Sequence, residues 1–190
     1  MSFIFKTRST GACCADKEKE TAAGELRKIA IVGNPNVGKS MTFNRLTGAY
    51  ATVSNYPGTT VEVFRGKIKL GPEEFEVVDT PGMYSLMPIS EEERVARNIL
   101  LNEQPVLVIH VIDAKNIERM LPFTLQLIEA ELPLILALNI MDEAKRLGMK
   151  IDVGYLEQEL KIPVVPTVST TGMGIAVLKQ RMESYVRSGN

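Results

Sequence analysis

The chain has 190 residues, of which 45% are hydrophobic and 24% charged, the composition of a soluble globular protein long enough to bury a core. Its 22 Lys and Arg oppose 23 Asp and Glu, and the net charge of -1 excludes a broad electrostatic attraction for nucleic acid or an acidic membrane surface. The two cysteines, Cys13 and Cys14, are adjacent and cannot close a disulfide framework, which favours a reducing cytoplasm. The longest apolar runs, residues 106–112 and 132–141, are shorter than the roughly 20 residues of a membrane-spanning helix, and no signal-peptide pattern is present.

Residues 1–26 lack hydrophobic periodicity and include a charged run at residues 16–20, which predicts a flexible tail. Residues 27–188 are predicted to form one domain. Within it, apolar runs of strand length alternate with amphipathic segments of helix length, the pattern of a sheet covered on both faces. We therefore expect an α/β fold with a mostly parallel six-stranded sheet and helices on both faces.

The six predicted strands are, in chain order, residues 28–32, 61–70, 74–79, 106–113, 133–139 and 164–169. Gly71-Pro72 predicts a hairpin, so we expect the second and third strands to be antiparallel and the others parallel. Ser90 followed by Glu93 is a capping-box pattern, which predicts the start of a covering helix. Apolar residues at helical spacing predict further helices at residues 123–132 and 175–186.

The first strand leads into Gly33-Asn34-Pro35-Asn36-Val37-Gly38-Lys39-Ser40, which matches G-x-x-x-x-G-K-[ST] at every fixed position. Glycines allow the backbone to approach a phosphate closely, and the N–H groups at the start of the next helix, through Met41, point at the anion. We expect Lys39 to bridge the β- and γ-phosphates and the Ser40 hydroxyl to bind Mg²⁺. The alternative is a chance glycine-rich turn, and the later motifs disfavour it.

A second motif, Asp79-Thr80-Pro81-Gly82, ends the third predicted strand, and ligand sites of open α/β sheets lie at the carboxyl ends of strands. Asp79 is expected to hold a magnesium-bound water, and the Gly82 N–H to reach the γ-phosphate, so that this loop responds to that phosphate. Upstream lies a turn-rich segment that contains Gly58-Thr59-Thr60. We assign the second of its threonines, Thr60, as a further magnesium ligand, with Thr59 as the alternative.

The segment Asn139-Ile140-Met141-Asp142 is a variant of the N-K-x-D motif that follows a buried strand. The Asp142 carboxylate can accept hydrogen bonds from N1–H and the 2-amino group of guanine, and adenine offers no matching pair of donors. After the last strand, Ser169-Thr170-Thr171 could offer a backbone N–H to the guanine O6. The sequence therefore predicts GTP and GDP as ligands.

All five segments occur in order between Gly33 and Gly174, and the chain resembles the translation-factor-related P-loop GTPases. It is most similar to the N-terminal G domains of the ferrous-iron transport protein B (FeoB) family. This resemblance rests on four stretches, which are Gly33–Asn36 with Phe43–Gly48, Asn55–Glu62, Asp79–Leu86 and Ala137–Ala144. It implies a Ras-like P-loop GTPase fold, and it also implies that an aliphatic residue such as Ile140 often replaces the lysine of N-K-x-D.

In that family the G domain precedes a helical spacer domain and a membrane permease for Fe²⁺. The resemblance thus implies a regulatory fragment that controls iron uptake at the cytoplasmic face of the inner membrane, with those two domains as partners. No iron-ligand cluster is visible in the sequence. One alternative is a free-standing RNA- or ribosome-associated assembly GTPase, although no basic appendage for nucleic acid is found. A second alternative is a non-catalytic scaffold that binds a nucleotide. The sequence does not decide whether the chain forms a homo-oligomer.

Met83 stands where Ras-type proteins carry the glutamine that orients the attacking water, and a methionine cannot do so. Arg65 lies on a predicted strand and is expected to be a solvated residue, not an arginine finger. His110, the single histidine, is expected to be a packed, hydrogen-bonded core residue.

We expect a slow, Mg²⁺-dependent GTPase in which Asn36, Lys39, Thr60 and Gly82 are the catalytic residues. Resemblance to potassium-activated relatives implies that the Asn36 side-chain oxygen holds K⁺, together with backbone carbonyls from residues 55–60. The alternative role for Asn36 is to brace the phosphate loop by hydrogen bonds.

Overall fold

The computed structural model describes residues 26–48 and 51–188, so the tail predicted for residues 1–26 lies outside the described residues except for Leu26. The described residues form one sheet of seven strands, in the order β2-β3-β4-β1-β5-β6-β7. The strands are β1 (Lys28–Val32), β2 (Ala51–Asn55), β3 (Glu62–Leu70), β4 (Glu73–Asp79), β5 (Leu107–Asp113), β6 (Leu134–Asn139) and β7 (Val164–Pro166). β2, β3 and β4 pair in antiparallel fashion, whereas β4, β1, β5, β6 and β7 are parallel.

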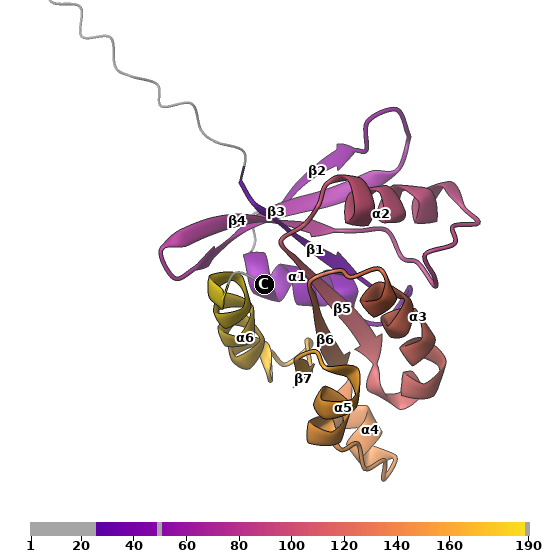
Figure 1. The fold of residues 1–190 in the computed structure, drawn as a ribbon, viewed down its shortest axis with the longest axis vertical. Helices are drawn as coiled ribbons and strands as arrows, with labels where there is room; N and C mark the ends of the chain where they lie inside the picture. The colour runs from indigo at the N-terminus through magenta and orange to yellow at the C-terminus, as the bar shows by residue number, and fades with distance from the viewer. Residues whose placement is uncertain (1–25, 49–50, 189–190) are drawn as a thin grey trace, which may run out of the picture.

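Six α-helices and a short 3₁₀-helix accompany the strands in the described residues. They are α1 (Lys39–Thr47), α2 (Glu91–Asn102), η1 (Ala114–Asn116), α3 (Ile117–Glu129), α4 (Met141–Arg146), α5 (Val153–Leu160) and α6 (Ile175–Ser188). α1 and α6 cover one face of the sheet, α2 and α3 cover the other, and α5 lies beside β7 (Figure 1). The predicted layers, the helices on both faces and the antiparallel β3–β4 hairpin are confirmed.

β1 shows why a central strand reads as a continuous apolar run in the sequence. Ile29 and Ile31 pack into the cluster under α1 and α6, and Ala30 and Val32 pack into the cluster under α2 and α3. Because successive side chains point to opposite faces, a strand buried on both faces needs an apolar residue at every position. Because β4, β1, β5 and β6 are parallel, their carboxyl ends meet at one edge of the sheet, where ligands of such sheets bind.

The sheet has seven strands and not the predicted six, because β2 was not predicted. All five of its residues are exposed, and Ala51-Thr52-Val53-Ser54-Asn55 offers only two apolar residues, Ala51 and Val53, in alternation with polar ones, which is a weak signal for a strand. It pairs with β3 as the edge of the sheet, where only one side needs a partner. The prediction of strand at residues 167–169 is also wrong, since β7 ends at Pro166.

The predicted covering helices are confirmed in kind but differ in their bounds. α3 begins at Ile117 and ends at Glu129 and contains Pro122, so the prediction of residues 123–132 missed its first turns, where Ile117, Met120 and Leu121 pack against a core cluster. The capping box of α2 forms as predicted, since Ser90 Oγ accepts from the Glu93 N–H at 3.2 Å. Within the described residues no helix is both long and apolar enough to span a membrane.

Arg65 is not the solvated residue that the sequence predicts. Its guanidinium donates to Glu76 at 2.8 Å and to Glu103, the residue that caps the end of α2, at 2.9 Å. Only 21% of the Arg65 side chain is exposed. The sequence could not reveal this network because Glu103 lies 38 residues from Arg65 and the three groups meet only when the sheet and α2 are assembled.

Candidate functional site

The phosphate-loop sequence connects the end of β1 to the start of α1, as predicted. Gly38 precedes the helix with φ +86°, and a Cβ atom there would lie 2.2 Å from Asn139 Nδ2. Only glycine satisfies both the left-handed backbone and the close approach. Asn36 also has a positive φ of 65°, which asparagine tolerates better than most residues. The loop between β1 and α1 thus has left-handed backbone at both Asn36 and Gly38.

Asn139, at the end of β6, joins two loops through its side-chain amide. Its Nδ2 donates to the Val37 carbonyl at 2.8 Å, and its Oδ1 accepts from the Ser169 N–H at 2.9 Å and the Ser169 hydroxyl at 3.0 Å. Asn139 is 2% exposed and Ser169 is equally buried. Since a buried amide must satisfy both ends, this side chain fixes the distance between the phosphate loop and the loop after β7.

Lys39 and Asp79 form a nearly buried ion pair at the start of α1. Lys39 Nζ donates to Asp79 Oδ1 at 2.5 Å, with 10% and 3% of the two side chains exposed. The structure thus brings together the predicted phosphate-binding cation and the predicted magnesium-linked carboxylate, which are 40 residues apart in the sequence. Ser40, the other predicted metal ligand, is exposed next to them.

Two adjoining hollows open at this edge of the sheet. One, of about 320 Å³, is lined by the loop after β1, the start of α1 and the loop after β4, through Asn34, Pro35, Asn36, Gly38, Lys39, Ser40, Met41 and Gly82. The other, of about 270 Å³, is lined by Asn36, Gly38, Met41, Asn139, Ile140, Asp142, Glu143, Val168, Ser169 and Thr170. They share Asn36, Gly38 and Met41, so a ligand with an anionic and a planar polar part could occupy both.

Ten predicted site residues do not line either hollow, and they are Gly33, Val37, Gly58, Thr59, Thr60, Asp79, Thr80, Pro81, Met141 and Thr171. Some of them have structural roles: the Thr80 hydroxyl donates to the Ile31 carbonyl at 3.0 Å, and Val37 and Met141 pack into core clusters. The Thr59 hydroxyl donates to the Tyr56 carbonyl at 2.9 Å. The Thr60 side chain is exposed and, within the described chain, has no hydrogen-bond partner, which leaves Thr60 the better candidate ligand of the two.

The loop after β4 is docked on the phosphate loop. A Cβ atom at Gly82 would lie 2.8 Å from Pro35 Cγ, and the Met83 N–H donates to the Gly33 carbonyl at 3.1 Å. The Met83 side chain is completely buried in the cluster under α2 and α3. It therefore serves as a core anchor for this loop, in agreement with the expectation that it does not orient water.

Side chains outside the sequence motifs, which were not predicted, hold these loops. The Glu93 carboxylate accepts from the Ile89 N–H at 2.8 Å, and Gln126 Oε1 accepts from the Leu86 N–H at 2.9 Å. Arg45 and Thr42, on α1, bind the loop after β7. The capping-box pattern did single out Glu93, but Gln126 and Arg45 carry no local signal because their partners lie 40 and 124 residues away.

The residues at this edge fit a magnesium ion that is shared with a phosphate. Mg²⁺ is held in such sites by one or two carboxylates and hydroxyls together with phosphate oxygens, and Asp79 and Ser40 supply these donors. No group of three or more His, Cys, Asp or Glu side chains that could hold a metal ion is found in the described part of the chain. The side-chain oxygen of Asn34, in the phosphate loop, is buried and accepts no hydrogen bond from the described part of the chain.

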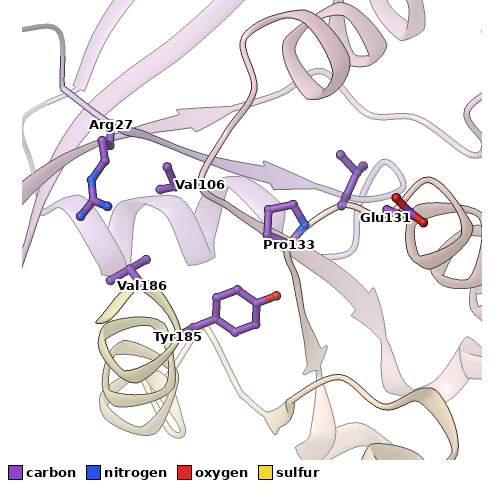
Figure 2. A pocket seen from close by; sticks show the side chains of 7 residues that line it. Arg27, Val106, Glu131, Pro133, Tyr185 and Val186 are labelled. Carbon is purple, nitrogen blue, oxygen red and sulfur yellow. The ribbon is translucent and has the colours of Figure 1, made fainter. Parts of the chain in front are cut away.

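A third hollow, of about 480 Å³, lies at the opposite edge of the sheet (Figure 2). It is lined by Arg27, Val106, Glu131, Leu132, Pro133, Tyr185 and Val186. These residues lie before the starts of β1, β5 and β6 and near the end of α6, whereas ligands of such sheets bind at the carboxyl ends of the strands. It holds no glycine and no helix start, so the two joined hollows are the candidate site.

The described domain matches a known family along nearly its whole length. A family model described as ferrous iron transport protein B matches residues 27–182. The chain belongs to this FeoB family. A relative in Porphyromonas gingivalis, the Fe(2+) transport protein A/Fe(2+) transporter FeoB fusion protein, is 46% identical over 156 residues. That alignment covers 82% of this chain and 18% of the relative, so the chain spans about a fifth of that relative's length.

Solved structures of FeoB proteins share the fold. The crystal structure of the G domain of the T. maritima FeoB iron transporter is 41% identical, has a TM-score of 0.79 and covers 85% of this chain and 99% of that chain. The cytosolic domain of the same transporter in a GMPPNP form is 44% identical with a TM-score of 0.80, over 84% of this chain and 64% of that chain. Its GDP form I is 43% identical with a TM-score of 0.80, over 85% and 63%. The fold is thus the Ras-like P-loop GTPase fold of FeoB G domains.

Proposed function

We propose that this domain binds guanine nucleotides, hydrolyses GTP with Mg²⁺, and controls Fe²⁺ uptake through a membrane permease to which it is joined at the cytoplasmic face of the inner membrane. The observation that carries the nucleotide part is the pair of joined hollows. Lys39 and the phosphate loop line one, and Asp142 lines the other. The GDP and GMPPNP forms of the T. maritima relative support the same class of ligand.

In this proposal the phosphate loop binds the β-phosphate through its backbone N–H groups and the N-terminus of α1. When nucleotide binds, Lys39 exchanges its ion pair with Asp79 for the phosphate oxygens. The Ser40 hydroxyl would then ligate Mg²⁺, with Thr60 as a further ligand, and Asp79 would hold a magnesium-bound water. The ion neutralises the charge that develops on the β- and γ-phosphates.

The base binds in the second hollow. Asp142 is exposed there, and its nearest ion-pair partner, Arg146, is 3.9 Å away, so the carboxylate is accessible to two donors. Guanine supplies N1–H and an amino group, and adenine would leave the carboxylate unpaired. The loop of Ser169, Thr170 and Thr171 offers backbone N–H groups to O6.

The regulatory part rests on the loop after β4. Gly82 lies against Pro35 of the phosphate loop, so a γ-phosphate that attracts the Gly82 N–H displaces a loop that continues into α2. A two-state loop of this kind is how P-loop GTPases signal their nucleotide state. Membership in the FeoB family favours an iron permease as the receiver of that signal over an RNA-bound partner.

The test measures phosphate release from GTP and from ATP by the purified chain with Mg²⁺. We expect slow release from GTP, none above background from ATP, and none in EDTA. Lys39→Ala and Ser40→Ala should each weaken Mg²⁺·GDP binding at least tenfold, because they remove about 2 kcal/mol or more of charge-assisted contact. Isothermal titration calorimetry measures the affinities.

The outcomes separate the competing functions. GDP binding without phosphate release would support a non-catalytic scaffold, and absence of GDP binding would refute the nucleotide site itself. The iron part is tested separately, by Fe²⁺ uptake into cells that lack their own FeoB and carry a complete FeoB protein with this domain. Lys39→Ala should abolish that uptake, and parental uptake by the variant would contradict regulation.

A further inference from the structure

Two side chains on one face of α1 bind the loop that follows β7. Thr42 Oγ1 lies 2.7 Å from Ser169 Oγ, and Arg45 Nε donates to the Ser169 carbonyl at 3.0 Å. Arg45 Nη2 also donates to the carbonyl of Thr170. A single guanidinium thus binds two successive carbonyls, a task that its planar array of donors suits well.

The remaining contacts of this loop come mostly from its own backbone. The Val168 N–H donates to the Met173 carbonyl at 2.9 Å, and the Gly172 N–H donates to the Val168 carbonyl at 2.9 Å. Asn139 holds Ser169 from the buried side, but Thr170 is exposed. In the described part of the chain, Arg45 is the side chain that binds the Thr170 carbonyl. The position of the loop tip therefore depends on Arg45.

We propose that Arg45 is a positioning residue that latches the loop of residues 169–171 over the bound guanine and slows nucleotide release. The proposal rests on the proposed function, in which this loop contacts the base. Arg45 lines neither hollow, so it acts through the loop and not by touching the nucleotide. Because α1 begins at the phosphate loop, Arg45 connects the base-binding loop to the same helix that binds the phosphates.

The size of the effect follows from the contacts. Because Arg45 is exposed, each of its two hydrogen bonds contributes modestly to the stability of the closed loop. Together they raise the ratio of closed to open loop by about a factor of ten. A loop that opens ten times more often releases its ligand about ten times faster, whereas the entry of a ligand into an open site is little changed. The phosphate contacts do not involve the loop and should be unaffected.

The experiment measures the dissociation rate of GDP that carries a fluorescent methylanthraniloyl group, by stopped flow with excess unlabelled GDP. Arg45→Ala should release it about tenfold faster with an unchanged association rate. Arg45→Lys should remain close to the alanine variant, because an ammonium is a point donor and cannot span both carbonyls. Asn44→Ala, at the exposed neighbouring position of α1, should behave as the parent.

Binding of inorganic pyrophosphate with Mg²⁺, which has no base, distinguishes a latch from a general weakening of α1. Its affinity should be the same in the parent and in Arg45→Ala, and an equal loss for pyrophosphate and GDP would overturn the proposal. Parental GDP release by Arg45→Ala or by Arg45→Lys would also overturn it. If the parent itself fails to bind the labelled GDP, the proposed function fails, which is a different result.

Discussion

Asp142 and Glu143 are adjacent carboxylates that line the same hollow but have different surroundings. Glu143 forms an ion pair with Lys115, and this lysine is held in turn by the start of η1, where its N–H donates to Asp113 at 2.9 Å. Among the described residues, Asp142 has only the distant Arg146 as an ion-pair partner, at 3.9 Å. The residue that is free to accept donors from a base is therefore Asp142.

We expect Asp142→Asn to weaken GDP binding by about 2–4 kcal/mol, because an amide cannot accept two donors as a carboxylate does. Calorimetric titration with GDP measures this loss. Glu143→Gln is the matched control and should bind GDP nearly as the parent does. Equal affinities of the two variants would show that Asp142 does not bind the base.

The role of Asn36 at the junction of the two hollows is a separate prediction. In the described chain its side chain makes no hydrogen bond to the protein, which argues against the brace and leaves the oxygen available to K⁺. A positive charge near the β- and γ-phosphates accelerates hydrolysis, and an arginine in that place is worth roughly 10³- to 10⁵-fold in other GTPases. If K⁺ at Asn36 supplies this charge, GTP turnover should rise when KCl replaces NaCl at equal ionic strength.

Asn36→Ala should abolish the potassium response and leave GDP binding nearly intact. Because the residue has φ +65°, Asn36→Gly is the better control for the backbone, since glycine adopts this conformation without strain. Both variants should respond alike. Equal GTP turnover of the parent in KCl and in NaCl would contradict a role for K⁺ at Asn36.

At the scale of elements, the segment from Gly82 to α2 joins the site to the rest of the fold. Its backbone is fixed from the inside by Glu93 and Gln126, while its large side chains at Tyr84, Met87 and Ile89 are exposed. Hydrogen bonds from the Ile89 N–H, and from Ser90 and Tyr84, hold the pKa of Glu93 below its ordinary value of 4.5, although burial acts in the opposite direction.

Glu93→Gln should loosen this segment, because an amide accepts these N–H groups less strongly than a carboxylate does. We expect a loss of about 1 kcal/mol in the free energy of local opening. Faster amide hydrogen exchange at Ile89 is the measurement, with Glu92→Gln, at the exposed position beside it, as the control.

The lowered pKa sets the sign of the acid response. A carboxyl whose folded pKa is depressed stabilises the fold above its ordinary pKa and loses that contribution as the pH falls through the folded value. The protection factor of the Ile89 amide, which corrects the exchange rate for its intrinsic slowing in acid, should thus fall with decreasing pH in the parent and fall less in Glu93→Gln. The same acid response in both would refute this role for Glu93.

At the scale of the whole molecule, His110 couples stability to pH. It is completely buried in β5, its Nδ1 lies 3.1 Å from the Thr124 hydroxyl, and its ring packs edge-on against Phe123. The expectation of a packed core histidine is confirmed, but only one of its nitrogens has a partner, because Nε2 has none among the described residues. Burial lowers the pKa of His110 to about 3.

Between that value and the ordinary pKa of 6.5, the unfolded chain binds a proton that the folded chain excludes. The free energy of unfolding should therefore fall with decreasing pH, by about 1.5 kcal/mol between pH 6.5 and 5 from this residue. Urea denaturation of the parent and of His110→Gln at several pH values measures the difference. The variant should show a flatter dependence, and identical slopes would contradict it.

The features that were predicted correctly from the sequence are those that depend on residues close together in the chain. The alternation of strands and helices, the hairpin at Gly71 and the capping box of Ser90 and Glu93 each depend on contacts within a few residues, and all are found. The phosphate loop is of the same kind, since its glycine and lysine spacing is written in consecutive positions. Solvent-exposed β2 was missed because an edge strand needs no apolar pattern.

Tertiary structure decided the contacts between distant segments. The pairing of Lys39 with Asp79, the brace at Asn139, the network of Arg65 and the latch at Arg45 each join residues that are 11 to 125 positions apart. A chain determines such contacts only through the packing of the whole sheet, because no local spacing reports which loop ends will meet. The sequence by itself therefore determined which groups could bind a nucleotide, and the assembled sheet decided which side chains hold those groups in place.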